Sequence, residues 1–491
     1  MTVPKPDYIF DRFMEWQTLA GFAADERPGA TLGIVSGRRR QGKTLLIESM
    51  CEELGGLYFA VPEDMPASEH LRRLAEAIAA FTGDLPPRLD TWDQAIEALF
   101  RLGTDKPVLV VLDEFPYMAH STSGLPSIIQ HALSPRGMAR TQSRTRLILC
   151  GSSISFMSQL VSGSAALFGR ARLSLVVQAF DFRTAAQFWQ AQNDPALATY
   201  LFAMVGGTPA YIEYTSGLPT SLADLDSWVP RNLLNSTNML FRQPRMLLSE
   251  DSAFSQIGMY GTVLTAIAEG SHTVSSIAQR VGRSTSDINH YVKGLTDGGF
   301  LAHHPDAFRA NRAMYQINDA LIRFHHAIVY PNWSRLELYR PERVAKLWAD
   351  SRDTFTSQVL GPAFEDICRA WTFDFASAES LDGEAASVEQ GVLNDPAGRS
   401  QLQLDIVVRD SGGEMIAIGE AKSGEVIGGR HLAKLRSAVG LLRSQQRIDA
   451  NRSPLLLLFS GAGFTPELEA EATSSGGAIQ LVGLDRLYSG S

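Results

Sequence analysis

One eight-residue loop constrains the fold of this 491-residue chain more than any other feature. The loop, Gly37-Arg38-Arg39-Arg40-Gln41-Gly42-Lys43-Thr44, fits the pattern GxxxxGK[ST] and stands between a strand-like apolar run and a helix-like run. Its two glycines let the backbone curl so that successive N–H groups point to one centre, to which the next helix adds its positive end. The pattern therefore predicts a strand, a phosphate-binding loop and a helix, in that order.

The same loop predicts which groups bind a nucleotide. Lys43 should reach the β and γ phosphates of ATP, and the Thr44 hydroxyl should bind Mg²⁺. A glycine-rich turn that fits the pattern by chance is the alternative, and the flanking runs argue against it. We expect the whole loop and the residue after it to contact the nucleotide: Gly37, Arg38, Arg39, Arg40, Gln41, Gly42, Lys43, Thr44 and Leu45.

A second apolar run, Val108–Leu112, ends in the carboxylates Asp113 and Glu114. Asp113 is expected to bind the metal directly or through its water, and Glu114 to orient and deprotonate the attacking water. Alone, such an ending would be read as a solvated acidic turn. Beside the phosphate loop it predicts the acidic half of an ATP-hydrolysing site, with Lys43 and Glu114 as catalytic residues.

Two further positions are candidates for sensing the γ-phosphate. The run 147–150 is followed by Gly151-Ser152-Ser153, where Ser152 or Ser153 could contact the phosphate, although a plain strand-to-helix turn fits equally well. Arg170 could supply positive charge to a transition state in this chain or a neighbouring subunit. The alternative is an ordinary surface arginine, because such residues cannot be placed by sequence alone.

The order of apolar and helical runs predicts an α/β fold with several domains. Strand-like runs at 32–35, 108–112, 147–150 and 173–176 alternate with helical patterns, which is typical of a parallel sheet covered on both faces. A chain of this length also exceeds the roughly 250 to 300 residues at which one core stops growing. We expect a P-loop ATPase core over 1–180, a helical lid over 181–250, and two further domains over 251–345 and 346–491.

The third domain has the pattern of a winged helix. A short helix over 273–281 ends at Gly282, a second helix follows over 284–295, and runs 298–301 and 314–317 could form a two-stranded wing. The second helix would then face DNA, unless the unit serves as a protein-docking or spacer module. Its outward residues are Thr285, Asn289, His290 and Lys293, with Arg309, Arg312 and Arg323 beyond it as further cations.

The last domain carries a second set of acids. Runs 402–409 and 415–422 should form a hairpin in which Asp405, Glu420 and Lys422 face one another. The carboxylates of Asp405 and Glu420 could bind Mg²⁺ while Lys422 polarises a water, an arrangement suited to phosphodiester hydrolysis. Glu365, on a helical run upstream, is a candidate for a further metal ligand.

Together these motifs resemble a prokaryotic family of AAA+-like P-loop ATPases, close to the STAND group and common in archaea. The resemblance implies a winged helix and a C-terminal PD-(D/E)XK nuclease-like domain with a restriction-endonuclease-like fold. Leu404 replaces the proline of the nuclease signature, and Gln403 stands where relatives tend to carry an acid. The motifs that carry the resemblance are Gly37–Thr44, Leu112–Glu114, Gly151–Ser153, Phe168–Arg170, Gly206–Ile212 and Phe10–Arg12.

Composition narrows the function classes. No apolar run approaches the ~18 to 20 residues of a membrane span, and the start lacks a signal-peptide pattern, so we expect a cytoplasmic protein without a membrane partner. A net charge of −9 opposes a polyanion on average. The sequence still favours an Mg²⁺-dependent ATPase that couples nucleotide state to DNA binding or cleavage, and a homo-oligomer is compatible with it. The alternative is a STAND-like regulatory switch with an inactive nuclease-like domain.

Overall fold

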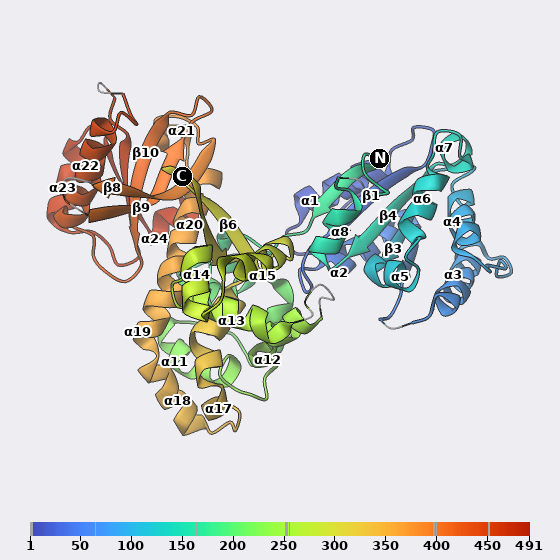
Figure 1. The fold of residues 1–491 in the computed structure, drawn as a ribbon, viewed down its shortest axis with the longest axis horizontal. Coiled ribbons are helices and arrows are strands. Elements are labelled where there is room, and N and C mark those ends of the chain that lie inside the picture. Colours follow the sequence, from blue (N-terminus) through green and yellow to red (C-terminus); the bar gives the residue numbers. More distant parts are fainter. Residues whose placement is uncertain are drawn as a thin grey trace. The chain divides into compact units, whose positions relative to one another are not determined.

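The chain forms two compact units in a computed structural model (Figure 1). The model describes residues 3–63, 65–163, 165–250, 254, 256–395, 398, 400–449 and 452–491. The N-terminal unit consists mainly of residues up to Ala179, and the C-terminal unit mainly of Phe180–Glu250, Phe254–Thr296 and Phe300–Ser491. None of the described helices is both long enough and apolar enough to cross a bilayer.

The N-terminal unit alternates strands and helices. Its elements are α1 (Phe13–Ala23), β1 (Thr31–Ser36), α2 (Lys43–Leu54), β2 (Leu57–Ala60), α3 (Ala67–Thr82), α4 (Trp92–Arg101), β3 (Val108–Asp113), α5 (Phe115–Ser121), α6 (Leu125–Ala132), α7 (Met138–Gln142), β4 (Thr145–Gly151), α8 (Ile154–Leu160) and β5 (Ala171–Val176).

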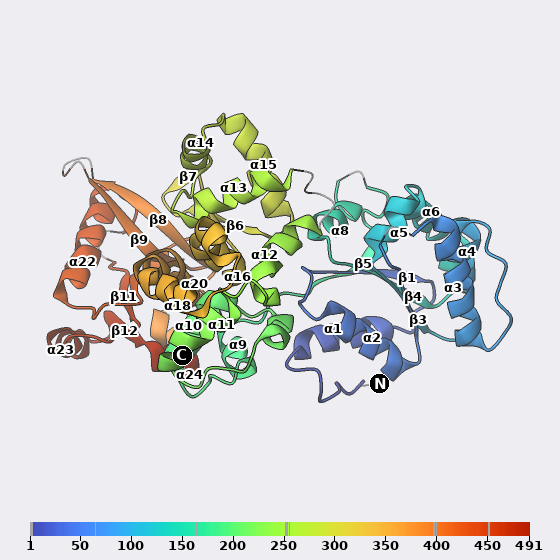
Figure 2. The same cartoon turned by 90° about the horizontal axis from the view of Figure 1, so that it is seen from below.

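The five strands of this unit form one parallel sheet in the order β2-β3-β4-β1-β5. Every residue of β1, β3 and β4 is buried, as expected for apolar strands covered on both faces. Trp16 and Ile47 from α1 and α2 pack on one face, and Ile96 and Phe115 from α4 and α5 pack on the other. Figure 2 shows α1 and α2 on one side of the sheet and α5, α6 and α8 on the opposite side.

The predicted parallel α/β sheet is confirmed, with one strand added. Strand β2 spans four residues, which is too short for an apolar pattern to stand out in the sequence. The order places the carboxyl ends of β1, β4 and β3 side by side, because β4 lies between the other two. Ligands of open α/β sheets bind at such an edge, where the strand order reverses.

The C-terminal unit joins helices to a second sheet. Its elements are α9 (Phe182–Phe188), α10 (Pro195–Val205), η1 (Pro209–Tyr214), η2 (Leu222–Asp224), α11 (Leu225–Asn232), α12 (Met239–Ser249), α13 (Ile257–Ala268), α14 (Val274–Val281), α15 (Thr285–Asp297), β6 (Leu301–Asp306), β7 (Arg309–Ile317), α16 (Ala320–Phe324), η3 (His325–Val329), η4 (Tyr330–Asn332), α17 (Trp333–Leu336), α18 (Pro341–Asp350), α19 (Arg352–Phe355), η5 (Thr356–Leu360), α20 (Gly361–Asp374), α21 (Ala378–Leu381), β8 (Ser387–Asp395), β9 (Ser400–Arg409), β10 (Met415–Lys422), α22 (Gly429–Ser444), β11 (Leu455–Ser460), α23 (Pro466–Ser474), β12 (Ile479–Gly483) and α24 (Leu484–Ser489).

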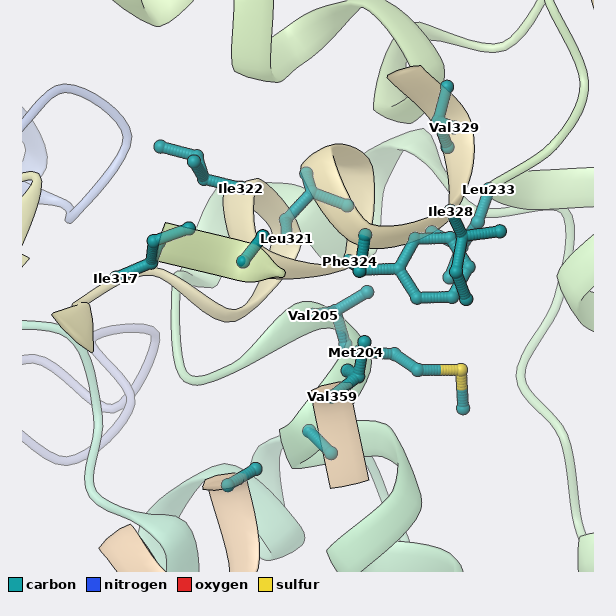
Figure 3. Packing of buried hydrophobic residues seen from close by; sticks show 14 of the residues in the cluster. Met204, Val205, Leu233, Ile317, Leu321, Ile322, Phe324, Ile328, Val329 and Val359 are labelled. Atoms are coloured by element: carbon teal, nitrogen blue, oxygen red, sulfur yellow. The ribbon is translucent and has the colours of Figure 1, made fainter. Parts of the chain in front are cut away.

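A continuous apolar core connects the helices of this unit. Met204 and Val205 of α10 pack with Phe324 of α16 and Val359 of η5 (Figure 3). The segment 182–249 contains helices and no strand among its described residues, as the sequence indicates, and its buried side chains such as Leu201 and Trp228 belong to this core. The region predicted as a lid therefore packs within the C-terminal unit, while the exact boundaries at 181, 251 and 346 stay predictions.

The second sheet is mixed and has seven strands in the order β12-β11-β10-β9-β8-β6-β7. Strands β9 and β10 form the predicted antiparallel hairpin, and β10 pairs in parallel with β11. Helices α14 and α15 are separated by Gly282, whose φ of 71° ends the first helix, and β6 and β7 form a hairpin after them. Asp306 of β6 pairs with Gln390 of β8, so the wing hairpin continues the C-terminal sheet.

Candidate functional site

The phosphate loop has a backbone that requires its glycines. Gly37 has a φ of 151°, and a Cβ there would lie 2.4 Å from the carbonyl oxygen of Val177. Gly42, with a φ of 84°, directly precedes the first residue of α2. These positions favour glycine because side-chain-bearing residues rarely adopt such angles. The loop therefore has the curled backbone that its sequence predicts, at the start of a helix.

Lys43 is buried beneath this loop. Its ammonium donates a hydrogen bond of 2.8 Å to the carbonyl oxygen of Arg38. Burial lowers the pKa of Lys43, and the nearby acids Asp113 and Glu114 partly counteract this effect. An ammonium that is held by one neutral carbonyl inside the loop is well placed to exchange that partner for phosphate oxygens.

Asp113 is held at the end of β3 by groups from three other positions. Its Oδ2 accepts hydrogen bonds from the Thr44 hydroxyl at 3.1 Å and from the Tyr58 hydroxyl at 2.8 Å. Its Oδ1 accepts the backbone N–H of Glu114 at 2.8 Å. The adjacent hydroxyl of Thr44 and carboxylate of Asp113 offer the hard oxygen ligands that Mg²⁺ prefers, so these residues fit the expected metal.

Glu114 has the electrostatic setting of a proton acceptor. Burial raises its pKa, as does the charge of Asp113, and its φ of 52° places it in the left-handed region. The Ser152 hydroxyl donates a hydrogen bond of 3.2 Å to Glu114 Oε2. Ser153 instead caps α8 by accepting the N–H of Phe156. Ser152 therefore contacts a residue of the site, Glu114, while its role as a phosphate sensor stays a prediction.

Three other residues predicted to act at the nucleotide site are Arg39 in the loop, Leu45 directly after it, and Arg170 before β5. The Arg39 guanidinium donates to the Tyr117 hydroxyl, which in turn donates to Glu63 at 3.1 Å. Leu45 is half exposed on α2. Arg170 precedes β5 and is partly buried, and its role as a source of positive charge stays a prediction.

Two residues that hold this site have no clear sequence signal. Tyr58 comes from β2, the strand that the apolar pattern misses. Arg12 donates hydrogen bonds to the carbonyl oxygens of Gln41 at 3.1 Å and Gln178 at 2.7 Å, and thus ties the loop to the segment after β5. Only the resemblance of Phe10–Arg12 to a family segment could have drawn attention to Arg12.

The acids of the C-terminal unit meet on neighbouring strands. Lys422 Nζ lies 2.9 Å from Glu420 Oε1 and 3.5 Å from Asp405 Oδ2. The Asp405 carboxylate also accepts the N–H of Ala421 at 3.0 Å and the Gln403 amide at 3.4 Å. Lys434 of α22, a residue that the sequence did not indicate, pairs with the other oxygen of Glu420. The hairpin thus brings Asp405, Glu420 and Lys422 together.

Helix α20 adds Glu365 to this cluster. Burial raises the pKa of Glu365 to about 8, and the charge of Asp405 adds to the effect. Arg369 lies 4.0 Å from Glu365, pairs with Asp366 at 2.6 Å, and donates to the backbone oxygen of Asp405 at 3.1 Å. Burial also raises the pKa of Asp405, together with the charge of Glu420.

The expected Mg²⁺ ligands of this cluster are not arranged as a metal centre. Within the described residues, no three or more His, Cys, Asp or Glu side chains come together in a way that could hold a metal ion. In this cluster Lys422 bridges Asp405 and Glu420, and Lys434 pairs with the remaining oxygen of Glu420. A role for Glu365, Asp405 and Glu420 as metal ligands stays a prediction.

The loop and the sheet edge define a P-loop ATPase domain. Residues 9–215 match the model of an ATPase domain found predominantly in Archaea. An uncharacterized protein of Methanocaldococcus jannaschii is 25% identical over 353 residues, which cover 71% of this chain and 74% of that protein.

One solved structure supports the fold, and a second is similar at a lower score. A Walker-type ATPase of Pyrococcus abyssi is similar with a TM-score of 0.50 and 17% identity, over 66% of this chain and 97% of that one. The ORC2 protein of Aeropyrum pernix has a TM-score of 0.40 and 16% identity, over 72% of this chain and 97% of that one.

Proposed function

We propose that the N-terminal unit hydrolyses ATP with Mg²⁺, and that nucleotide turnover is coupled to DNA binding and cleavage by the C-terminal unit. The observation that carries the ATPase part is the chain of contacts from Thr44 to Asp113, and from Glu114 to Ser152, at adjoining strand ends. This arrangement supplies a metal ligand, a base and a polar contact for the base within one edge of the sheet.

Each residue of the site would have a separate role in ATP hydrolysis. Backbone N–H groups of the loop would bind the phosphates, and Lys43 would turn from the Arg38 carbonyl to the β and γ oxygens. When bound to Thr44 and Asp113, Mg²⁺ would neutralise charge on the phosphates. Glu114, with its raised pKa, would accept a proton from the attacking water, and Ser152 would hold its carboxylate in position.

Steady-state ATPase kinetics and nucleotide binding test this proposal. Glu114→Gln should lower kcat by about 100-fold or more, the usual contribution of a general base, while ATP still binds. Lys43→Ala should weaken ATP binding itself. Glu52→Gln, on the exposed side of α2, serves as the matched control and should leave both quantities unchanged. Full turnover in Glu114→Gln would contradict the assignment.

The second part of the proposed function is metal-dependent cleavage of DNA by the C-terminal unit. It is supported by the meeting of Asp405, Glu420 and Lys422 beside Glu365, where the carboxylates would hold Mg²⁺ once it displaced Lys422 and Lys434 from them. Lys422, close to both carboxylates, would hold and polarise the attacking water. Plasmid nicking in Mg²⁺ should be lost in both Asp405→Ala and Lys422→Ala.

The alternative is an ATP-dependent regulatory switch with an inactive nuclease-like domain. It is supported by the lysines that already neutralise Asp405 and Glu420. In that case ATP sets a conformational state, the winged helix docks DNA or protein, and no nicking that depends on Asp405 is observed. The same assay thus separates the two functions.

A further inference from the structure

A basic hollow lies where the wing meets the C-terminal sheet. It has a volume of about 570 Å³ and is lined by side chains from three elements of the C-terminal unit. Arg309, Arg312 and Tyr315 come from β7, Gln401 comes from β9, and Thr273 and Ser275 lie at the start of α14. The hollow exists because β6 pairs with β8, which fixes the wing hairpin beside the β8–β9 hairpin.

The lining of this hollow has the chemistry of an anion site. Its lining residues carry two guanidinium groups, hydroxyls and an amide, and none of those that the structure describes is acidic. Arg309 donates to the neutral side chain of Asn394. In the described part of the chain, the neighbouring ion pairs join Arg280 to Glu269 and Arg323 to Asp366, and not Arg309 or Arg312. Guanidinium groups that keep their charge without a carboxylate partner bind phosphate well, because their donors match two of its oxygens.

The position of Gln401 connects the hollow to the acidic cluster. Gln401, Gln403 and Asp405 alternate along β9, so their side chains share one face of the sheet, and Gln403 contacts Asp405 directly. Four residues of strand span about 13 Å. One strand of a duplex advances ~3.4 Å along the helix axis per nucleotide, so a short segment of it spans this distance. One strand of DNA could therefore contact the hollow and the acids together.

Helix α15, the second helix of the winged helix, should attract DNA phosphates more weakly than the basic hollow does. Around α15 the cations Arg280, Arg283 and Lys293 are matched by Glu269, Asp287 and Asp297, and Arg280 is paired with Glu269. Because phosphate attraction depends on uncompensated local charge, the hollow is favoured over the helix face.

We propose that this hollow binds a backbone phosphate of DNA and that the strand continues along Gln401 and Gln403 towards Asp405. The inference deepens the proposed DNA-directed function and rests on it. Arg312 is the principal contact, because Arg309 is already bonded to Asn394. The winged helix then serves to position the DNA backbone beside the acids, with the hollow rather than α15 as its main contact.

The test is DNA affinity of the full chain, measured by fluorescence anisotropy with a duplex oligonucleotide in EDTA, so that no cleavage occurs. Arg312→Gln should weaken binding about 10-fold and lower the salt slope by about 1, as expected for one lost phosphate contact. Arg312→Lys, which keeps the charge, should retain most of the affinity. Arg283→Gln removes an exposed arginine of the helix-turn-helix segment and is the control.

The results separate this inference from the cleavage proposal. If Arg283→Gln weakens binding and Arg312→Gln does not, the hollow is not the phosphate site, even where nicking depends on Asp405. If Arg312→Gln weakens binding but Asp405→Ala does not change nicking, the hollow stands and the cleavage proposal fails. Thermal unfolding of Arg312→Gln should match that of the unmodified chain, which rules out a folding defect as the cause of weaker binding.

Discussion

The carboxylates of the two acidic sites have different partners: hydroxyl groups in the N-terminal unit and lysine ammonium groups in the C-terminal unit. In the N-terminal unit, Asp113 is held by neutral hydroxyls of Thr44 and Tyr58, and Lys43 is bonded to a carbonyl. In the C-terminal unit, Asp405 and Glu420 are paired directly with lysine. A cation that enters the first site meets an available carboxylate, whereas one that enters the second must displace an ammonium group. The first site is therefore prepared for a metal and phosphates, and the second is internally neutralised.

The largest expected difference between the two sites is in ATPase activity when one acid is removed from each. Asp113→Asn should lower ATPase kcat by more than about 100-fold, because the site loses the charge expected to hold Mg²⁺ while its shape is kept. Asp405→Asn should leave ATPase activity within about 2-fold, since it lies in the other unit. The measurement is ATP turnover at saturating Mg²⁺. Equal activity of Asp113→Asn and the unmodified chain would contradict the assigned role.

The second prediction concerns folding stability. Lys422→Met leaves Asp405 and Glu420, which are each 2% exposed, without their shared cation. Breaking a buried ion pair costs about 3 kcal/mol in free energy of unfolding. Lys346→Met, an exposed position on α18, should change it by less than about 0.5 kcal/mol. Urea denaturation monitored on the C-terminal unit measures both, and equal midpoints would show that the acids are not held by Lys422.

The third prediction concerns how the free energy of unfolding depends on pH through Glu365 in the C-terminal unit. Burial raises the pKa of Glu365 from its ordinary value of 4.5 to about 8 in the folded chain. Between these values the folded state keeps a proton that the unfolded state has lost, so this group stabilises the fold below pH 4.5 and loses that contribution as the pH rises to 8. Glu365→Gln should flatten the fall in unfolding free energy over this window. An unchanged pH profile would contradict the buried, protonated state of Glu365.

The sequence predicted the parts of the fold that depend on local pattern. The Gly37–Thr44 loop, the apolar run before Asp113, and the hairpin that carries Asp405 and Glu420 are each contained in a short segment, so spacing and alternation are enough. The contacts that complete the sites join distant segments. Tyr58 reaches Asp113 from a strand of four residues, and no periodicity indicates which side chain of such a strand faces the site.

Tertiary pairing also explains what the sequence could not predict in the C-terminal unit. Lys434 lies on a helix turn that packs over β10, and only the packing shows that it reaches Glu420. The sequence predicts a separate two-stranded hairpin for β6 and β7. The pairing of Asp306 with Gln390 instead makes this hairpin part of a larger sheet. Both results depend on how two elements dock, which a single sequence does not specify.

The smallest expected effect is at Tyr58. Its hydroxyl donates to the same Asp113 oxygen as Thr44, so Tyr58→Phe removes one of the two hydrogen bonds to Oδ2, while the N–H of Glu114 still binds Oδ1. The loss of one such bond is worth about 1 kcal/mol, which corresponds to a 5-fold rise in the Mg²⁺ concentration needed for half-maximal ATPase activity. Tyr8→Phe, which removes a hydroxyl bonded to Ser49 on an exposed ring, is the matched control. If the two variants respond to Mg²⁺ alike, Tyr58 does not orient Asp113, and the Thr44 hydroxyl with the Glu114 N–H is enough to hold the carboxylate that distinguishes this site from the lysine-paired one.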